Sequence, residues 1–298
     1  MTEREKTIGR WPDFFIIGAA KCGTSAMYDY LVRHPRLFMS EIKETEYYSK
    51  EAIYSKGPEW YRDLFREAGA DQLCGEASTT YSRWPHTPDV AARINRDAPD
   101  ARLIYVMRHP VQRTFSHYSH HMRLGVTMTF EEALAKDDIY VDCSKYMEQI
   151  RRYERFFPRD RFLFLFHDEY RKNPRDVLCK VQRFLGIEEL DLTSEGLLFS
   201  NVTGADNFIR KNTTKKLRSL PLINSIADNM PQNWKDRAYS ILKKSPIGRK
   251  LEAKHKIEPM REETRDRLLE LFEPHTRDLE QYLGIELPSW NSHEIRRP

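Results

Sequence analysis

Short apolar runs alternate with segments of helical spacing along most of this chain. The apolar runs at 14–17, 103–107 and 161–166 have the length and composition of buried strands. Helical spacing of apolar residues is found at 24–31, 146–156, 175–185 and 262–283. Pro274, inside the last segment, predicts a kink or a fresh helix start. Strands that alternate with helices predict an α/β fold, in which helices flank a central parallel sheet.

The run FFIIGAAKCGTS at 14–25 joins the first predicted strand to the first predicted helix. The chain must turn here over a helix N-terminus, where backbone N–H groups and the helix dipole favour an anion. The Lys21 ammonium and the hydroxyls of Thr24 and Ser25 would point at the same anion. The sequence therefore predicts a phosphate-binding loop.

This loop departs from the pattern of loops that bind ATP. In G-x-x-x-x-G-K-[ST] the lysine follows the second glycine, and the next hydroxyl holds magnesium. Gly18 and Gly23 have that spacing, but Thr24 stands in the lysine position and Lys21 lies inside the loop. We infer a loop suited to a terminal group that leaves without a metal. The simpler alternative is an ordinary strand-to-helix turn with a surface lysine.

A second strand end carries another candidate anion site. Residues 103–107 are followed by Arg108, and Pro110 is well placed to open a helix. Helical spacing leaves Arg113 and Ser116 on one flank of that helix. The inward set is Val111, Phe115, Tyr118 and Met122. Arg108 and Ser116 would thus converge on a second phosphate, although an isolated arginine here is more often part of an ion pair.

Composition limits the alternatives further. The 298 residues are 40% hydrophobic and 32% charged, which is typical of a large globular domain. No apolar run of about 18 residues is present to cross a bilayer, and the N-terminus lacks the order of a signal peptide. The net charge of +4 is too small to indicate nucleic acid and fits an enzyme that handles anions. We therefore expect a cytoplasmic enzyme.

The segment 206–256 differs from its surroundings, because it is basic, polar and broken by three prolines. We predict one domain over 1–298, with a mobile or helical excursion at this segment. The four cysteines have neither C-x-x-C pairing nor metal-ligand spacing, so we expect reduced thiols and no metal site. They are Cys22, Cys74, Cys143 and Cys179. Cys22, in the loop, is either a thiol of lowered pKa or a small buried side chain.

The two loops together resemble those of sulfotransferases that use 3′-phosphoadenosine 5′-phosphosulfate (PAPS). Lys21-Cys22-Gly23-Thr24-Ser25 looks like the 5′-phosphosulfate loop of that family. The run RHPVQRTFS at 108–116 looks like its 3′-phosphate motif, R-[DN]-P-x-x-R-x-x-S, with His109 as the one departure. The similarity extends through 166–186 and 279–290.

This resemblance implies the P-loop-like fold of the family, with PAPS as donor, adenosine 3′,5′-bisphosphate (PAP) as product, and no metal. The stretch 201–210 occupies the place of the family's late nucleotide-covering loop. The nucleotide-binding residues implied are Lys21, Cys22, Gly23, Thr24, Ser25, Arg108, Ser116 and Arg210.

The run KETEYY at 43–48 is similar to the K-E-x-x-F-F segment of heparan-sulfate-type and related bacterial sulfotransferases. The first glutamate of that segment acts as base, which implies this role for Glu44. Its aromatic neighbours would desolvate the carboxylate, which also suits a base. A solvated charge run is the alternative, and His117, His120 and His121 are reserve bases.

The run GEASTTY at 75–81 matches a strand end that lines the acceptor cleft of the family. Heparan enzymes commonly have a lysine after the glutamate. Ala77 stands there instead, which weakens the case for a heavily sulfated polysaccharide. Nearby aromatic rings offer stacking faces to a sugar or a lipid-like alcohol, with packing as the alternative role. The acceptor contacts predicted are Tyr47, Tyr48, Glu76, Tyr81 and Trp84.

The reaction implied is in-line transfer of a sulfuryl group to a hydroxyl or amine of a saccharide, a lipid or another small alcohol. Glu44 would take the acceptor proton, and Lys21 would stabilise charge on the departing 5′-phosphate. Two alternatives stay open, a P-loop kinase that uses ATP and a nucleotide-binding protein without turnover. The position of Lys21 disfavours the first, and the presence of Glu44 disfavours the second.

Overall fold

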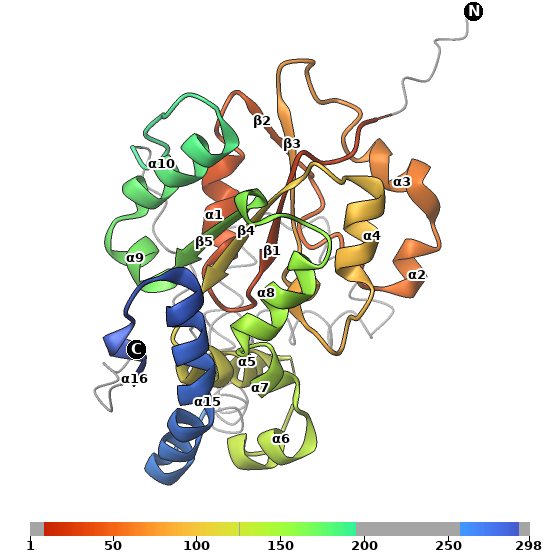
Figure 1. The fold of residues 1–298 in the computed structure, drawn as a ribbon. Coiled ribbons are helices and arrows are strands. Elements are labelled where there is room, and N and C mark those ends of the chain that lie inside the picture. Colours follow the sequence, from red (N-terminus) through yellow and green to blue (C-terminus); the bar gives the residue numbers. More distant parts are fainter. Residues whose placement is uncertain (1–8, 125, 195–256, 292–298) are drawn as a thin grey trace, which may run out of the picture.

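The computed structural model describes residues 9–124, 126–194 and 257–291, and a parallel five-stranded sheet lies at its centre (Figure 1). The strands are arranged in the order β2-β3-β1-β4-β5. Their bounds are β1 Phe14–Gly18, β2 Leu37–Met39, β3 Leu73–Ala77, β4 Arg102–Met107 and β5 Phe162–Phe166. The prediction of a central parallel sheet flanked by helices is confirmed.

Strand β1 is central in the sheet and pairs on both sides. Phe14 lies opposite Gly75 of β3 and Arg102 of β4. Every residue of β1 is buried, because helices cover both faces of the sheet. Because both faces of β1 are buried, its residues are apolar throughout and do not alternate with polar ones.

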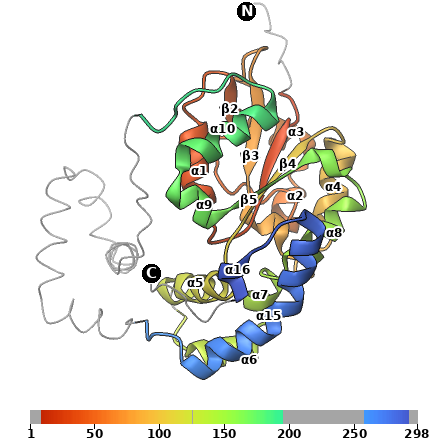
Figure 2. The same cartoon turned by 60° about the vertical axis from the view of Figure 1, so that its left-hand side comes forward.

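The helices form three groups around the sheet (Figure 2). One face is covered by α1 Thr24–Leu31, α9 His167–Lys172 and α10 Pro174–Leu185. The other face is covered by α2 Glu51–Tyr54, α3 Gly57–Asp63, α4 Val90–Asp97 and α8 Tyr146–Glu154. Beyond the carboxyl ends of the strands lie α5 Pro110–Arg123, α6 Phe130–Lys136, α7 Ile139–Asp142, α15 Glu262–Leu283 and α16 Pro288–Asn291. Short 3₁₀ helices are η1 Thr79–Ser82 and η2 Arg159–Arg161.

The helices beyond the strand ends share a hydrophobic core of their own. Val111 and Met122 of α5 pack in it with Phe130 of α6 and Phe272 of α15. The predicted inward stripe of α5 is therefore confirmed. Helix α15 runs unbroken through Pro274, so a fresh helix start at this residue is excluded.

Several expectations were incomplete. Strands β2 and β3 were not among the apolar runs predicted from hydrophobic pattern. The excursion at 206–256 and Arg210 lie outside the described residues. In the part of the chain that the structure describes, no helix has the length and apolar character needed to cross a membrane.

Candidate nucleotide and acceptor site

The predicted phosphate loop connects β1 to α1 at the carboxyl edge of the sheet. The Ala19 N–H donates to the Val106 carbonyl at 2.8 Å, which anchors the loop to β4. Lys21 (φ 73°) and Gly23 (φ 88°) have left-handed backbones, and Gly23 is the N-cap of α1. A Cβ on Gly23 would lie 3.3 Å from His167 Cδ2, so both conformation and space favour glycine. The first-turn N–H groups of α1 are thereby presented to an anion.

Lys21 lies in a strongly positive environment. Burial, together with the charges of Arg123, Arg108 and Lys43, lowers the pKa of its ammonium to about 8. Like charges gathered this closely repel one another until an anion binds between them. The arrangement favours a polyanionic ligand at the loop.

Cys22 is completely buried in the loop, and burial raises the pKa of its thiol to about 11. A neutral buried thiol is a poor nucleophile, so the structure supports a packing role for this side chain. Thr24 is buried and Ser25 is half-buried in the first turn of α1. All four cysteines are free.

Arg108, directly after β4, lies beside the phosphate loop. Its Nη1 donates to the Lys21 carbonyl at 3.4 Å, and its Nε and Nη2 lie 3.3 Å from Gln112 Oε1. The Tyr146 hydroxyl donates to the Arg108 carbonyl at 2.6 Å. Burial lowers the pKa of the guanidinium, which is a sign of a cation held away from water. Ser116 is half-buried on α5, and its hydroxyl makes no hydrogen bond with a described residue.

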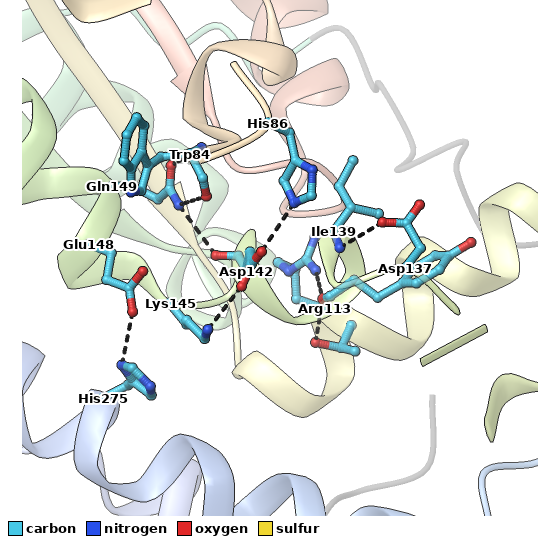
Figure 3. Close-up of polar contacts among 12 residues, drawn as sticks. Trp84, His86, Arg113, Asp137, Ile139, Asp142, Lys145, Glu148, Gln149 and His275 are labelled. Carbon is cyan, nitrogen blue, oxygen red and sulfur yellow. Dashed lines mark hydrogen bonds and ion pairs between the residues drawn. The ribbon is translucent and has the colours of Figure 1, made fainter. Parts of the chain in front are cut away.

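Arg113 does not share the open flank of Ser116, contrary to expectation. Its side chain is completely buried within the polar network beside α7 (Figure 3). It donates to Ser144 Oγ and to the Tyr140 carbonyl, and Nη1 lies 3.3 Å from His117 Nδ1. The flank that looked polar faces protein, because α7 and α15 both pack against α5.

Glu44 lies where the loop after β2 crosses the end of β3. Its backbone is left-handed (φ 57°), and its N–H donates to the Ala77 carbonyl at 3.0 Å. Its Oε2 accepts from the N–H of Thr79 at 2.8 Å and from the Thr79 hydroxyl at 3.1 Å. The charge of the neighbouring Lys43 contributes to the lowered pKa of Lys21. Glu44 therefore lies at the same carboxyl edge of the sheet as the phosphate loop.

Glu76, predicted as an acceptor contact, is completely buried at the end of β3. Its carboxylate accepts hydrogen bonds from four hydroxyl groups. The donors are Thr45 at 2.8 Å, Tyr61 at 2.6 Å, Tyr81 at 2.9 Å and Ser78. Burial raises the pKa of this carboxyl, and the hydroxyl donors oppose the rise. Glu76 is therefore an anchor beneath the site that ties the 44–48 segment to β3 and η1.

The predicted aromatic contacts are part of the same buried layer. Tyr47, Tyr48 and Tyr81 are at most 2% exposed. Tyr47 stacks on Tyr61 with ring centroids 4.2 Å apart, and Tyr48 meets Tyr81 edge-on at 5.7 Å. These rings fill space behind Glu44 and present no free face, which supports the packing alternative.

Trp84 is half-buried, and its backbone exchanges hydrogen bonds with the Gln149 side chain at 2.8 and 2.9 Å (Figure 3). The Arg152 guanidinium lies 4.3 Å from the centroid of the Trp84 ring. One face of the indole is therefore occupied by an arginine.

The reserve bases differ in access. His117 is buried, and burial together with Arg113 lowers its pKa far below the usual range. His121 is half-buried, with Nδ1 2.7 Å from the Tyr140 hydroxyl. Burial lowers its pKa, and Arg83 and Lys21 act in the same direction. His121 thus lies near Lys21 and Arg83 and is less enclosed than His117.

Sequence reasoning missed two cations, Arg83 and Arg123. Burial lowers the pKa of Arg123, which pairs with no carboxylate among the described residues. Arg83 follows η1, and its Nε is buried without a hydrogen-bond partner in the described part of the chain. Arg123 lies seven residues after Ser116 on α5, two helical turns away on the same face. That spacing was a usable signal, whereas nothing in the sequence marks Arg83.

The loop after the central strand β1 and Arg108 after the neighbouring strand β4 lie at the carboxyl edge of a parallel sheet, which is where α/β proteins bind their ligands. A family model described as the sulfotransferase domain matches residues 11–281. The chain belongs to this sulfotransferase family.

Curated relatives and a solved structure agree with that placement. Human bifunctional heparan sulfate N-deacetylase/N-sulfotransferase 3 is 27% identical over 223 residues, covering 67% of this chain and 25% of the relative. Human heparan sulfate glucosamine 3-O-sulfotransferase 6 is 28% identical over 206 residues, covering 65% of this chain and 58% of the relative. This chain therefore spans only part of the length of both. A sulfotransferase from Alicyclobacillus acidocaldarius shares the fold, with a TM-score of 0.66 and 24% identity over 95% of this chain and 99% of the other.

Proposed function

We propose that this protein transfers a sulfuryl group from PAPS to a hydroxyl or amine of an acceptor. The observation that carries the proposal is the placement of Lys21 and Glu44 at the carboxyl ends of the neighbouring strands β1 and β3. Lys21 would supply positive charge at the phosphate loop, and the half-buried Glu44 carboxylate would accept a proton from the acceptor. Membership of the sulfotransferase family supports this reading.

The donor is proposed to bind across the two strand ends. The loop at 18–25 would hold the 5′-phosphosulfate, and Arg108 with Ser116 would hold the 3′-phosphate. Lys21, Arg108 and Arg123 together supply cationic charge close to these groups. With this charge available from side chains, we propose a transfer that needs no metal.

In the proposed step Glu44 accepts the proton of the acceptor group while that group attacks sulfur. A bond forms between the acceptor atom and sulfur, and the bond from sulfur to the bridging oxygen breaks. Its electron pair goes to the 5′-phosphate of the departing PAP. The Lys21 ammonium and the loop N–H groups stabilise the charge that develops there.

We propose a saccharide that carries negative charge as the acceptor. The names of both relatives include heparan sulfate, which is an anionic saccharide. Two cations near the site also support an anionic acceptor. Arg83 and Arg123 have no acidic partner among the described residues. They offer the positive charge that Ala77 does not provide.

The test is turnover with labelled PAPS against separate pools of charged saccharides, neutral saccharides and lipid alcohols. Product masses identify the acceptor, and a labelled charged saccharide is the result expected. Glu44→Gln should keep PAP affinity and lose about 10² to 10⁴ in transfer rate. An active Glu44→Gln beside an inactive His121→Asn would assign the base to the histidine. Tight binding of magnesium-ATP in preference to PAP would instead support a kinase, and PAP binding without transfer to any pool would support a binding protein.

A further inference from the structure

The two oxygens of the Glu44 carboxylate have different surroundings. Oε2 accepts two hydrogen bonds, both from Thr79, with the N–H at 2.8 Å and the hydroxyl at 3.1 Å. No described residue donates a hydrogen bond to Oε1. One oxygen is therefore held by Thr79, and the other makes no hydrogen bond with a described residue.

The backbone around Glu44 is fixed as closely as its side chain. Its left-handed conformation (φ 57°) is uncommon for a residue other than glycine, and its N–H is bonded to the Ala77 carbonyl. The next residue, Thr45, is bonded to the buried Glu76. Thr79 is the first residue of η1, which packs against the end of β1. The carboxylate is therefore tied to the same rigid sheet edge that carries the phosphate loop.

We propose that Thr79 is a positioning residue for the reaction, which holds Oε2 of Glu44 so that Oε1 faces the acceptor. This inference rests on the proposed function. The position of Thr79 would thus determine the direction in which the Glu44 carboxylate faces the acceptor.

The informative change is Thr79→Val, which keeps the backbone N–H and the size of the side chain but removes the hydroxyl. Thr80→Val is a matched control, because the Thr80 hydroxyl contacts Ser49 Oγ at 2.7 Å rather than Glu44. Thr79→Ser restores the donor and is expected to restore the rate. All three variants are compared with the unmodified chain in PAP affinity and kcat.

We expect Thr79→Val to lower kcat about tenfold at neutral pH with unchanged PAP affinity, the size expected for one hydrogen bond to a charged group. Thr80→Val should leave both kcat and PAP affinity unchanged.

Two results would overturn the inference in different ways. Unchanged kcat in Thr79→Val, beside an inactive Glu44→Gln, would remove the role of Thr79 and leave the proposed function intact. Full activity of Glu44→Gln, or failure of the unmodified chain to transfer sulfuryl groups, would overturn the proposed function and the role of Thr79 with it.

Discussion

Binding of PAP should take up a proton at Lys21. Burial and the neighbouring arginines lower the pKa of this ammonium to about 8 in the free protein. A bound dianionic phosphate reverses the balance of charge and raises the pKa again. The ammonium form is therefore the form that binds, and affinity falls as the pH rises above 8.

The magnitude follows from the fraction of Lys21 that is protonated. With a pKa of about 8, this fraction is about nine-tenths at pH 7, about half at pH 8 and about one-tenth at pH 9. The Kd for PAP should thus increase about tenfold from pH 7 to pH 9. Cys22 and His109 do not titrate in this window, since the pKa of Cys22 is about 11 and that of His109 is about 4.

Isothermal titration calorimetry at pH 8 in two buffers of different ionisation enthalpy measures the proton uptake. About half a proton per nucleotide is expected. Lys21→Arg is the matched variant, because a guanidinium keeps its charge throughout this range and should abolish both the uptake and the pH dependence. A Kd that is constant from pH 7 to pH 9 in the unmodified chain, with no proton uptake at pH 8, would refute the reasoning.

Three further predictions concern neighbouring groups. Arg108→Ala should weaken PAP binding about 10- to 100-fold and AMP binding far less, because a charge-assisted contact to the 3′-phosphate is lost; equal losses in calorimetry would place Arg108 elsewhere. Glu76→Ala should lower the free energy of unfolding in urea by about 3 kcal/mol or more, since four buried hydroxyls lose their acceptor, whereas the exposed Glu59→Ala should have little effect. A small Glu76→Ala effect would contradict an anchoring role. Cys22 should react slowly with iodoacetamide at pH 8 because its thiol is buried and neutral, and rapid modification seen by peptide mass spectrometry would contradict this.

The hydrophobic pattern predicted the longer apolar strands β1, β4 and β5. It did not predict β2 or β3. Strand β2 has three residues, which is too short for a periodic signal. Strand β3 contains Gly75 and Glu76, neither of which looks like sheet interior. Gly75 is needed because a Cβ there would lie 2.1 Å from the Phe14 ring, and Glu76 is tolerated because four hydroxyls satisfy it. Such compensation is visible only once distant residues are brought together.

The site shows the same division. Motif spacing nominated Lys21, Arg108 and Glu44, and the structure brings all three to one edge of the sheet. Motif spacing could not predict that Arg113 is buried while Ser116 is only half-buried, because the burial of α5 depends on its packing against α7 and α15.

The burial of Arg113 affects how the proposed nucleotide site should respond to salt. The guanidinium is held by Ser144, the Tyr140 carbonyl and His117, and no described carboxylate pairs with it. Its charge nevertheless acts on the Cys22 thiol, so its field reaches the phosphate loop. Dissolved ions screen exposed charges far more than buried ones. Part of the attraction for the proposed donor nucleotide would therefore come from a buried charge, and it should persist at ionic strengths that screen the exposed lysines.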